Sequence, residues 1–125
     1  MRKVVFTEDA PNAIAPYSQA VKGGGFIFVS GQLAIDPATE RIIEGNIGQQ
    51  TERVLQNIAR ILEAAGFGMS KVVRCGVFLK SMNDFDAMNE VYGKIFGPHP
   101  PAGTTVELAC LPKESLVAID AIALE

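Results

Sequence analysis

Two amphipathic segments separate groups of short apolar runs, and this alternation limits the folds that the chain can adopt. In the first segment apolar residues recur at helical spacing over residues 47–65, with Asn46 as the N-cap and Gly66 placed to end the helix. The second segment covers residues 83–96 and is stopped by Gly97-Pro98. Both segments are predicted to be helices.

The remaining apolar runs are too short and too rich in β-branched residues for helices, so they are predicted to be strands. Gly23-Gly24-Gly25 lies between two of them and predicts a hairpin turn, because glycine adopts positive φ without strain. Asp36-Pro37-Ala38-Thr39 predicts a surface turn. The predicted strands are Lys3–Thr7, Ser18–Lys22, Phe26–Gln32, Lys71–Lys80, Thr104–Cys110 and Ser115–Ala123.

The order of these elements, β-β-β-α-β-α-β-β, predicts a single α+β domain over residues 1–125. A hydrophobic content of 48% is sufficient for a buried core. Right-handed crossovers place both helices on one face of a mixed sheet. The other face is then left uncovered, and an apolar sheet face exposed to water favours self-association. We therefore expect a homo-oligomer of cyclic symmetry, built sheet to sheet.

Charge and hydropathy argue against several classes of protein. The 11 Lys and Arg residues are scattered among 14 Asp and Glu residues, for a net charge of −3, which disfavours binding to nucleic acid or to an anionic membrane surface. No apolar run approaches the roughly 20 residues of a transmembrane helix, and the N-terminus has no signal-peptide core. Cys75 and Cys110 each lie in an apolar run and are predicted to be buried in a protein of a reducing compartment, so we expect a cytoplasmic location.

The sequence indicates neither a metal nor a cofactor. His99 is the only histidine, and no cysteine or carboxylate stands at ligand spacing around it. The glycine run at 23–25 lacks the GK[ST] ending and the following helix of a phosphate-binding loop. We expect no metal site and no cofactor.

Two charged residues interrupt apolar strands and are candidates for chemistry. Asp120 lies within the apolar run Leu116–Ile122, and its carboxylate either faces solvent at a sheet edge or lies in a pocket and takes part in proton transfer. Arg74 precedes Gly76 on another strand. We expect Arg74 to be exposed and ion-paired, and the alternative is a cation that binds substrate.

Smaller signals have both a structural and a functional interpretation. Ser30-Gly31 closes an apolar strand, where small residues either end the strand or let a ligand approach backbone N–H groups. Tyr17 follows Pro16 and either covers the core or offers a phenol to a cleft. Asn89 lies beside the apolar stripe of the second helix and faces either solvent or a subunit boundary.

Motifs along nearly the whole chain resemble the RidA/YjgF family. They are APYSQ at 15–19, VSGQ at 29–32, VFLK at 77–80, MNDF at 82–85, NEVY at 89–92, PPA at 100–102, VELA at 106–109 and LPK at 111–113. The resemblance implies a chorismate-mutase-like fold and a homotrimer with sites at the subunit boundaries. It also implies cofactor-free hydrolysis of reactive 2-enamino and 2-imino acids to 2-keto acids and ammonia.

By position, the resemblance implies roles for individual residues. Asp120 stands where the family commonly has a glutamate that positions a water. The other implied site residues are Tyr17 lining the pocket, Ser30 and Gly31 bounding it, the backbone of Thr105 contacting the substrate, and Asn89 supporting the site from the helix.

Gly103 is the main departure from the family pattern. Family members with deaminase activity read Pro-Ala-Arg where this chain reads Pro101-Ala102-Gly103, and that arginine pairs with the substrate carboxylate. An unpaired carboxylate in a partly buried site costs about 3–5 kcal/mol, or roughly two to four decades in rate. We therefore expect a deaminase of reduced or altered specificity, or else a non-catalytic trimer that binds a small metabolite or a protein. Ribonuclease activity, attached to old family names, is disfavoured by the acidic charge balance.

Overall fold

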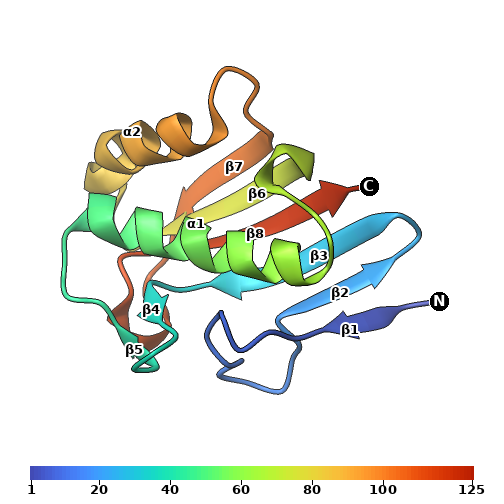
Figure 1. Cartoon of the computed structure of the whole chain (residues 1–125). Coiled ribbons are helices and arrows are strands. Elements are labelled where there is room, and N and C mark those ends of the chain that lie inside the picture. The colour runs from blue at the N-terminus through green and yellow to red at the C-terminus, as the bar shows by residue number, and fades with distance from the viewer.

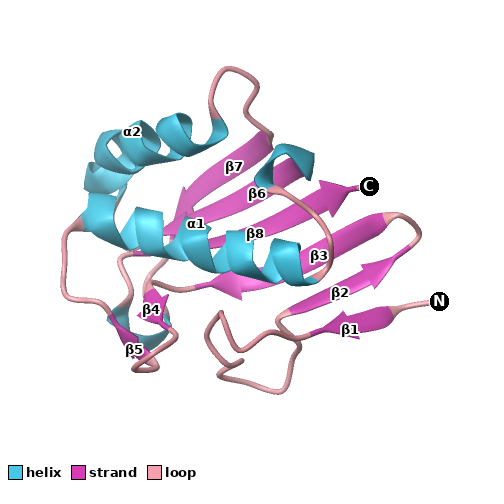
Figure 2. Cartoon of the chain, viewed as in Figure 1, coloured by secondary structure: helices cyan, strands magenta, loops and turns pink.

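Two helices cover one face of a six-stranded mixed sheet in the computed structural model, which describes residues 1–125 (Figure 1, Figure 2). The strand order is β1-β2-β3-β8-β6-β7. Neighbouring strands are antiparallel except for β6 and β7, which are parallel. The predicted mixed α+β class is confirmed. The strands are β1 (Lys3–Val5), β2 (Ala20–Gly23), β3 (Phe26–Gln32), β6 (Val72–Leu79), β7 (Ala102–Glu107) and β8 (Val117–Leu124).

The two helices are α1 (Ile47–Ala64) and α2 (Phe85–Phe96), close to their predicted bounds. Asn46 caps α1 in a reciprocal arrangement, because its Oδ1 accepts from the Gln49 N–H at 3.0 Å while Gln49 Oε1 accepts from the Asn46 N–H at 2.9 Å. Gly66 follows α1 with a φ of 83°, the left-handed conformation predicted for it. The cap and stop signals of the sequence therefore act as predicted.

The core lies between the helices and the sheet face that they cover. Ile58 and Leu62 of α1 are fully buried, as are Ile27 of β3 and Ile119 of β8. These side chains belong to one continuous apolar cluster that also contains the inward residues of β6. Alternate residues of each strand therefore point into the core, and the intervening residues point to the opposite face.

The structure differs from the predicted elements by one to three residues at several strand ends, and it contains one hairpin that was not predicted. A short hairpin of β4 (Ile35–Asp36) and β5 (Arg41–Ile42) surrounds the predicted surface turn. β7 ends at Glu107 and not at Cys110, because its partner strand β6 ends opposite it at Leu79 and has no further residues to pair with. Cys110 is consequently exposed, so its predicted burial is wrong, whereas Cys75 is buried as predicted.

No helix packs on the second face of the sheet, which we call the open face (Figure 1). Large apolar side chains are exposed on its strands, including Phe28 at 50% and Val106 at 38%. The uncovered apolar sheet face predicted from the sequence is therefore present. No helix of the structure is both long and apolar enough to span a bilayer.

Candidate functional site

Asp120 of β8 lies opposite an irregularity in the pairing of β3 with β8. Val29 pairs with Ala121 and Gln32 pairs with Ile119, so Ser30 and Gly31 together stand opposite Asp120. One extra residue in β3 is a β-bulge, which bends the strand and redirects its side chains. The bulge therefore brings three of the predicted site residues together from segments that are far apart in the sequence.

The cross-strand register extends this arrangement across the sheet. Asp120 pairs with Gly76 of β6, and Gly76 pairs with Thr104 of β7. Ser30, Gly31, Asp120, Gly76 and Thr104 thus form one line across four strands, which we call the open-face row. Asp120 is half-buried on an interior strand, so the alternative in which it faces solvent at a sheet edge is wrong.

Gly76 both holds the Asp120 carboxylate and leaves room for it. The Gly76 N–H donates to Asp120 Oδ1 at 2.7 Å, the only hydrogen bond that this carboxylate makes within the chain. A Cβ atom at position 76 would lie 2.7 Å from the same oxygen and 3.3 Å from Phe78 Cζ. A side chain there would displace the carboxylate, so the glycine fixes its position and leaves Oδ2 free for a ligand.

Arg74 shares a cavity of about 370 Å³ with Asp120 on the open face. Its Nη2 donates to Thr104 Oγ1 at 3.3 Å. Arg74 is exposed as predicted, but it makes no ion pair, so the ion-paired state expected from the sequence is wrong. The cause is the register, which surrounds the guanidinium with apolar and hydroxyl side chains and places no carboxylate within 4.0 Å.

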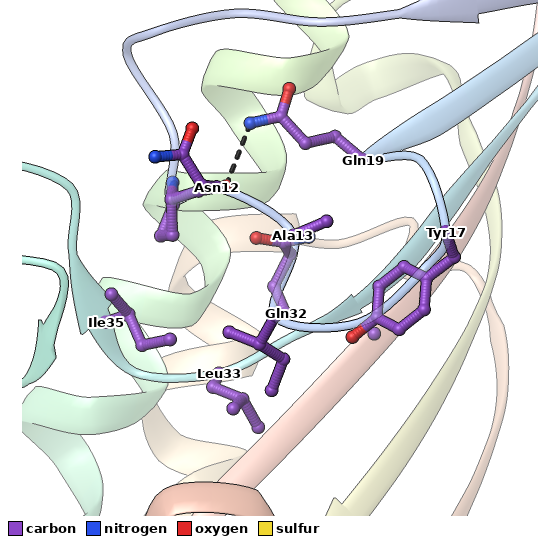
Figure 3. Close-up of a pocket in the computed structure, with 10 residues that line it drawn as sticks. Asn12, Ala13, Tyr17, Gln19, Gln32, Leu33 and Ile35 are labelled. Atoms are coloured by element: carbon purple, nitrogen blue, oxygen red, sulfur yellow. Dashed lines mark hydrogen bonds between the residues drawn. The ribbon is translucent and has the colours of Figure 1, made fainter.

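Tyr17 lies beside the row and lines a second cavity of about 360 Å³ with Ser30, Gly31 and Ala118. Figure 3 shows Tyr17 projecting from a loop, and the buried side chain of Gln19 forms hydrogen bonds that hold this loop. Gln19 Nε2 donates to the Pro11 carbonyl at 2.9 Å, and Gln19 Oε1 accepts from the Thr7 N–H at 2.8 Å. This side chain thus positions the loop that carries the phenol.

The other predicted site residues lie on the helix-covered side of the sheet. A Cβ atom at Gly103 would point toward α2, lying 3.2 Å from the Cys75 carbonyl and 3.9 Å from Tyr92 Oη. Thr105 follows two residues later on the same face of β7, and Asn89 lies half-buried on α2. Within one chain, these three residues do not meet Asp120 or Tyr17.

A cysteine and a tyrosine lie near Gly103 but are poorly suited to chemistry at neutral pH. Burial raises the pKa of the Cys75 thiol above its ordinary value. Burial also raises the pKa of Tyr92, in the direction that keeps the phenol protonated. Neither group is an activated nucleophile or base at neutral pH.

Sequence reasoning missed two members of the row, Gly76 as a carboxylate anchor and Thr104 as a hydroxyl donor or acceptor. The available signal for Thr104 was its position beside Thr105, because adjacent strand residues point to opposite faces. Only the register of β7 on β6 decides which threonine joins the open face. No group of three or more His, Cys, Asp or Glu side chains lies close enough to hold a metal ion.

Comparison with known proteins decides the family. The family model described as Endoribonuclease L-PSP matches residues 7–125. A RutC family protein of Pyrococcus horikoshii is 53% identical, with 98% of each chain covered. The chain belongs to the RidA/YjgF family. Human 2-iminobutanoate/2-iminopropanoate deaminase is 38% identical over 100% of this chain and 91% of its own length. A Rid family protein of Yersinia pestis superposes with a TM-score of 0.96 at 40% identity, each chain fully covered.

The segments that carry the RidA/YjgF motifs lie on two faces of the chain. The RidA/YjgF motifs at 15–19 and 29–32 supply Tyr17, Ser30 and Gly31 to one cavity, and the last strand supplies Asp120 beside them. The motif at 89–92 lies on α2, away from this group. One chain therefore keeps these two groups of residues apart.

Proposed function

We propose that this RidA/YjgF protein hydrolyses reactive 2-imino acids and their enamine tautomers to 2-keto acids and ammonium, without a cofactor. In balanced form, R–C(=NH2⁺)–COO⁻ and H2O give R–CO–COO⁻ and NH4⁺. The observation that carries the proposal is the Asp120 carboxylate, anchored by the Gly76 N–H at 2.7 Å on an open cavity wall. The human relative named as a 2-iminobutanoate/2-iminopropanoate deaminase supports the same reaction class.

Asp120 is proposed as the general base and then the general acid. Its free oxygen takes a proton from water as the water oxygen bonds to the imine carbon, giving a carbinolamine whose amine is uncharged. The protonated carboxyl returns that proton to nitrogen, and the C–N bond breaks as the hydroxyl proton passes to the departing amine. The carboxylate is regenerated, so the cycle needs no other reactant.

We further propose that the active form is a homotrimer with its sites at subunit boundaries. β7 is an edge strand, so Gly103 and the Thr105 backbone are accessible to a neighbouring chain, as is the half-exposed Tyr17. If the Tyr17 cavity of one chain lies against β7 of the next, Tyr17 comes close to Gly103 and Thr105, which a single chain keeps apart from it. Asn89 on α2 would then support the completed site.

The trimer predicts a sedimenting species of about 40 kDa, three times the 13.4 kDa chain. Phe28→Asp would place a charge on the exposed apolar face and is expected to give monomers at micromolar concentration. Analytical ultracentrifugation of both proteins measures this directly. A native chain that sediments as a stable monomer would contradict the assembly.

The deaminase proposal predicts faster release of ammonia from 2-aminoacrylate generated in situ than in the protein-free reaction. Gly103→Arg is the informative variant, because it restores the arginine of active family members. Its Cβ would lie 3.2 Å from the Cys75 carbonyl, so the strand must shift by a few tenths of an ångström to accept it. We expect the native chain to be active; a silent native chain beside an active Gly103→Arg variant would refute the proposal.

A silent native chain would instead support the second candidate, a non-catalytic trimer that binds a small metabolite or a protein partner through the same clefts. The observation favouring it is Gly103, which supplies no positive charge to β7. The ribonuclease activity in the family model's description is not favoured, since acidic residues outnumber basic ones, 14 to 11. Cys75 and Cys110 are both free, which supports a cytoplasmic location.

A further inference from the structure

A further cavity lies between the two helices, on the side of the sheet that they cover (Figure 1). Its volume is about 400 Å³, within the range of small-molecule sites. We call it the interhelix cavity. It shares no residue with the two cavities described above, so it is separate from the open face and from the proposed active site. Its apolar walls are Leu55 and Ala59 of α1, Met69 of the short turn after α1, and Val91 and Ile95 of α2.

The apolar surface of α2 is wider than the part that the core covers. Met88 is the only residue of α2 that is buried, whereas Ile95 is 38% exposed and Val91 is half-buried. Val91 and Ile95 are four positions apart, so their side chains are neighbours on the helix surface, and both face the interhelix cavity. Leu55, which is 1% exposed, belongs to the same cavity on the α1 side. A ligand with an apolar part would remove both its own surface and these side chains from water.

The charged groups at the interhelix cavity favour a cation. Glu52 and Lys94 are the only charged residues that line it. The Lys94 Nζ lies 3.6 Å from Glu90 Oε1, so a carboxylate of its own helix already pairs with it. Glu52 makes no ion pair, and its Oε1 accepts from Gln56 Nε2 at 3.4 Å. Two carboxylates and one ammonium therefore lie around the cavity, and the carboxylate without a cationic partner is Glu52.

We propose that the interhelix cavity binds a small primary amine in its ammonium form, with the nitrogen at the Glu52 carboxylate and the carbon chain between Leu55 and Ile95. An apolar wall with one charge at its rim matches a ligand with one apolar and one charged end. Burial of the carbon chain supplies most of the affinity. Because Glu52 is exposed, its ion pair with the ammonium adds selectivity for charge more than strength. This site does not depend on the proposed deaminase function.

The test compares three six-carbon probes that differ in the charge of the head group, namely n-hexylammonium, 1-hexanol and hexanoate. Amide chemical shifts of the native chain are followed by NMR during titration at neutral pH. We expect hexylammonium to bind about two- to five-fold more tightly than hexanol, the usual contribution of an exposed ion pair, and hexanoate to bind most weakly. The largest shifts are expected at Gln56, Ala59 and Val91. Hexanol or hexanoate binding as tightly as hexylammonium, or largest shifts outside the cavity, would overturn the proposal.

n-Butylammonium tests the apolar part of the contact, because it keeps the charge and is two methylenes shorter. A fully buried methylene improves affinity about four-fold. We therefore expect hexylammonium to bind about five- to fifteen-fold more tightly than butylammonium. Equal affinities would show that the nitrogen binds without the carbon chain, and the cavity would lose its role.

Two variants alter the cavity itself. Ala59→Leu extends a side chain from α1 into the cavity and keeps a good helix former, so we expect hexylammonium to bind at least ten-fold more weakly with an unchanged circular dichroism spectrum. Glu52→Gln keeps the shape of the side chain and removes its charge. We expect it to reduce hexylammonium to the affinity of hexanol and to leave hexanol unchanged. Native-like binding of hexylammonium by either variant would contradict the assignment.

Glu63→Gln is the matched control, because it removes an exposed carboxylate of the same helix about three turns beyond Glu52. Glu63 does not line the interhelix cavity, so this variant should bind all three six-carbon probes as the native chain does. A loss equal to that of Glu52→Gln would overturn the proposal, since it would show that the net charge of the chain attracts the amine.

Discussion

Replacing Asp120 with asparagine is expected to lower kcat/KM for imine hydrolysis by about a hundred- to ten-thousand-fold, the range for loss of a general acid–base group. The amide oxygen can still accept from the Gly76 N–H, so the side chain keeps its position between β3 and β6. An amide cannot take a proton from water, however, and the hydrolytic step loses its base. Keto acid formation from 2-iminopropanoate generated in situ measures the loss.

Asp120→Glu is the control for this variant, because it keeps the carboxylate and lengthens the side chain by one methylene. We expect it to retain activity within about ten-fold of the native chain, since proton transfer depends first on the presence of a base. Circular dichroism and sedimentation should be unchanged in both variants. Native-like activity of Asp120→Asn would remove Asp120 from the chemistry.

Local signals were sufficient to predict most elements of this fold. β3 begins and ends at its predicted residues, Phe26 and Gln32, because the glycine turn before it and its own apolar run define it locally. The α1 cap at Asn46 and the left-handed Gly66 likewise depend on neighbours within one helical turn. The β4–β5 hairpin was missed because its strands are two residues each and carry no periodic signal.

The sequence could not predict which face of the sheet the charged side chains point to, because this depends on pairing between strands that are far apart in the sequence. Val72 pairs with Ala123 and Arg74 pairs with Ile122, so one extra residue lies between them in β6. Strict alternation from buried Val72 would turn Arg74 toward the helices, and the extra residue turns it to the open face instead. The second bulge, at Ser30 and Gly31, has the same origin on β3.

The candidate site combines what the sequence indicated with what only the register decides. Asp120 was identified because a carboxylate inside an apolar strand is unusual. Its neighbours Gly76 and Thr104 are ordinary residues by type, and they gain a role only because β6 and β7 place them on the same row. The composition of the candidate site therefore depends on strand pairing as much as on the residues that motifs identify.

Gln19→Leu is expected to lower the free energy of unfolding by about 2–4 kcal/mol and to raise KM, because Gln19 anchors the loop that carries Tyr17. The side chain is 3% exposed and bonds the Thr7 N–H and the carbonyls of Thr7 and Pro11, which would lose their partners. Chemical denaturation at fixed protein concentration measures the loss. Gln56→Leu, the same change at an exposed amide on α1, should cost less than about 0.5 kcal/mol. Equal stabilities of the two variants would show that the buried amide does not hold the loop in place.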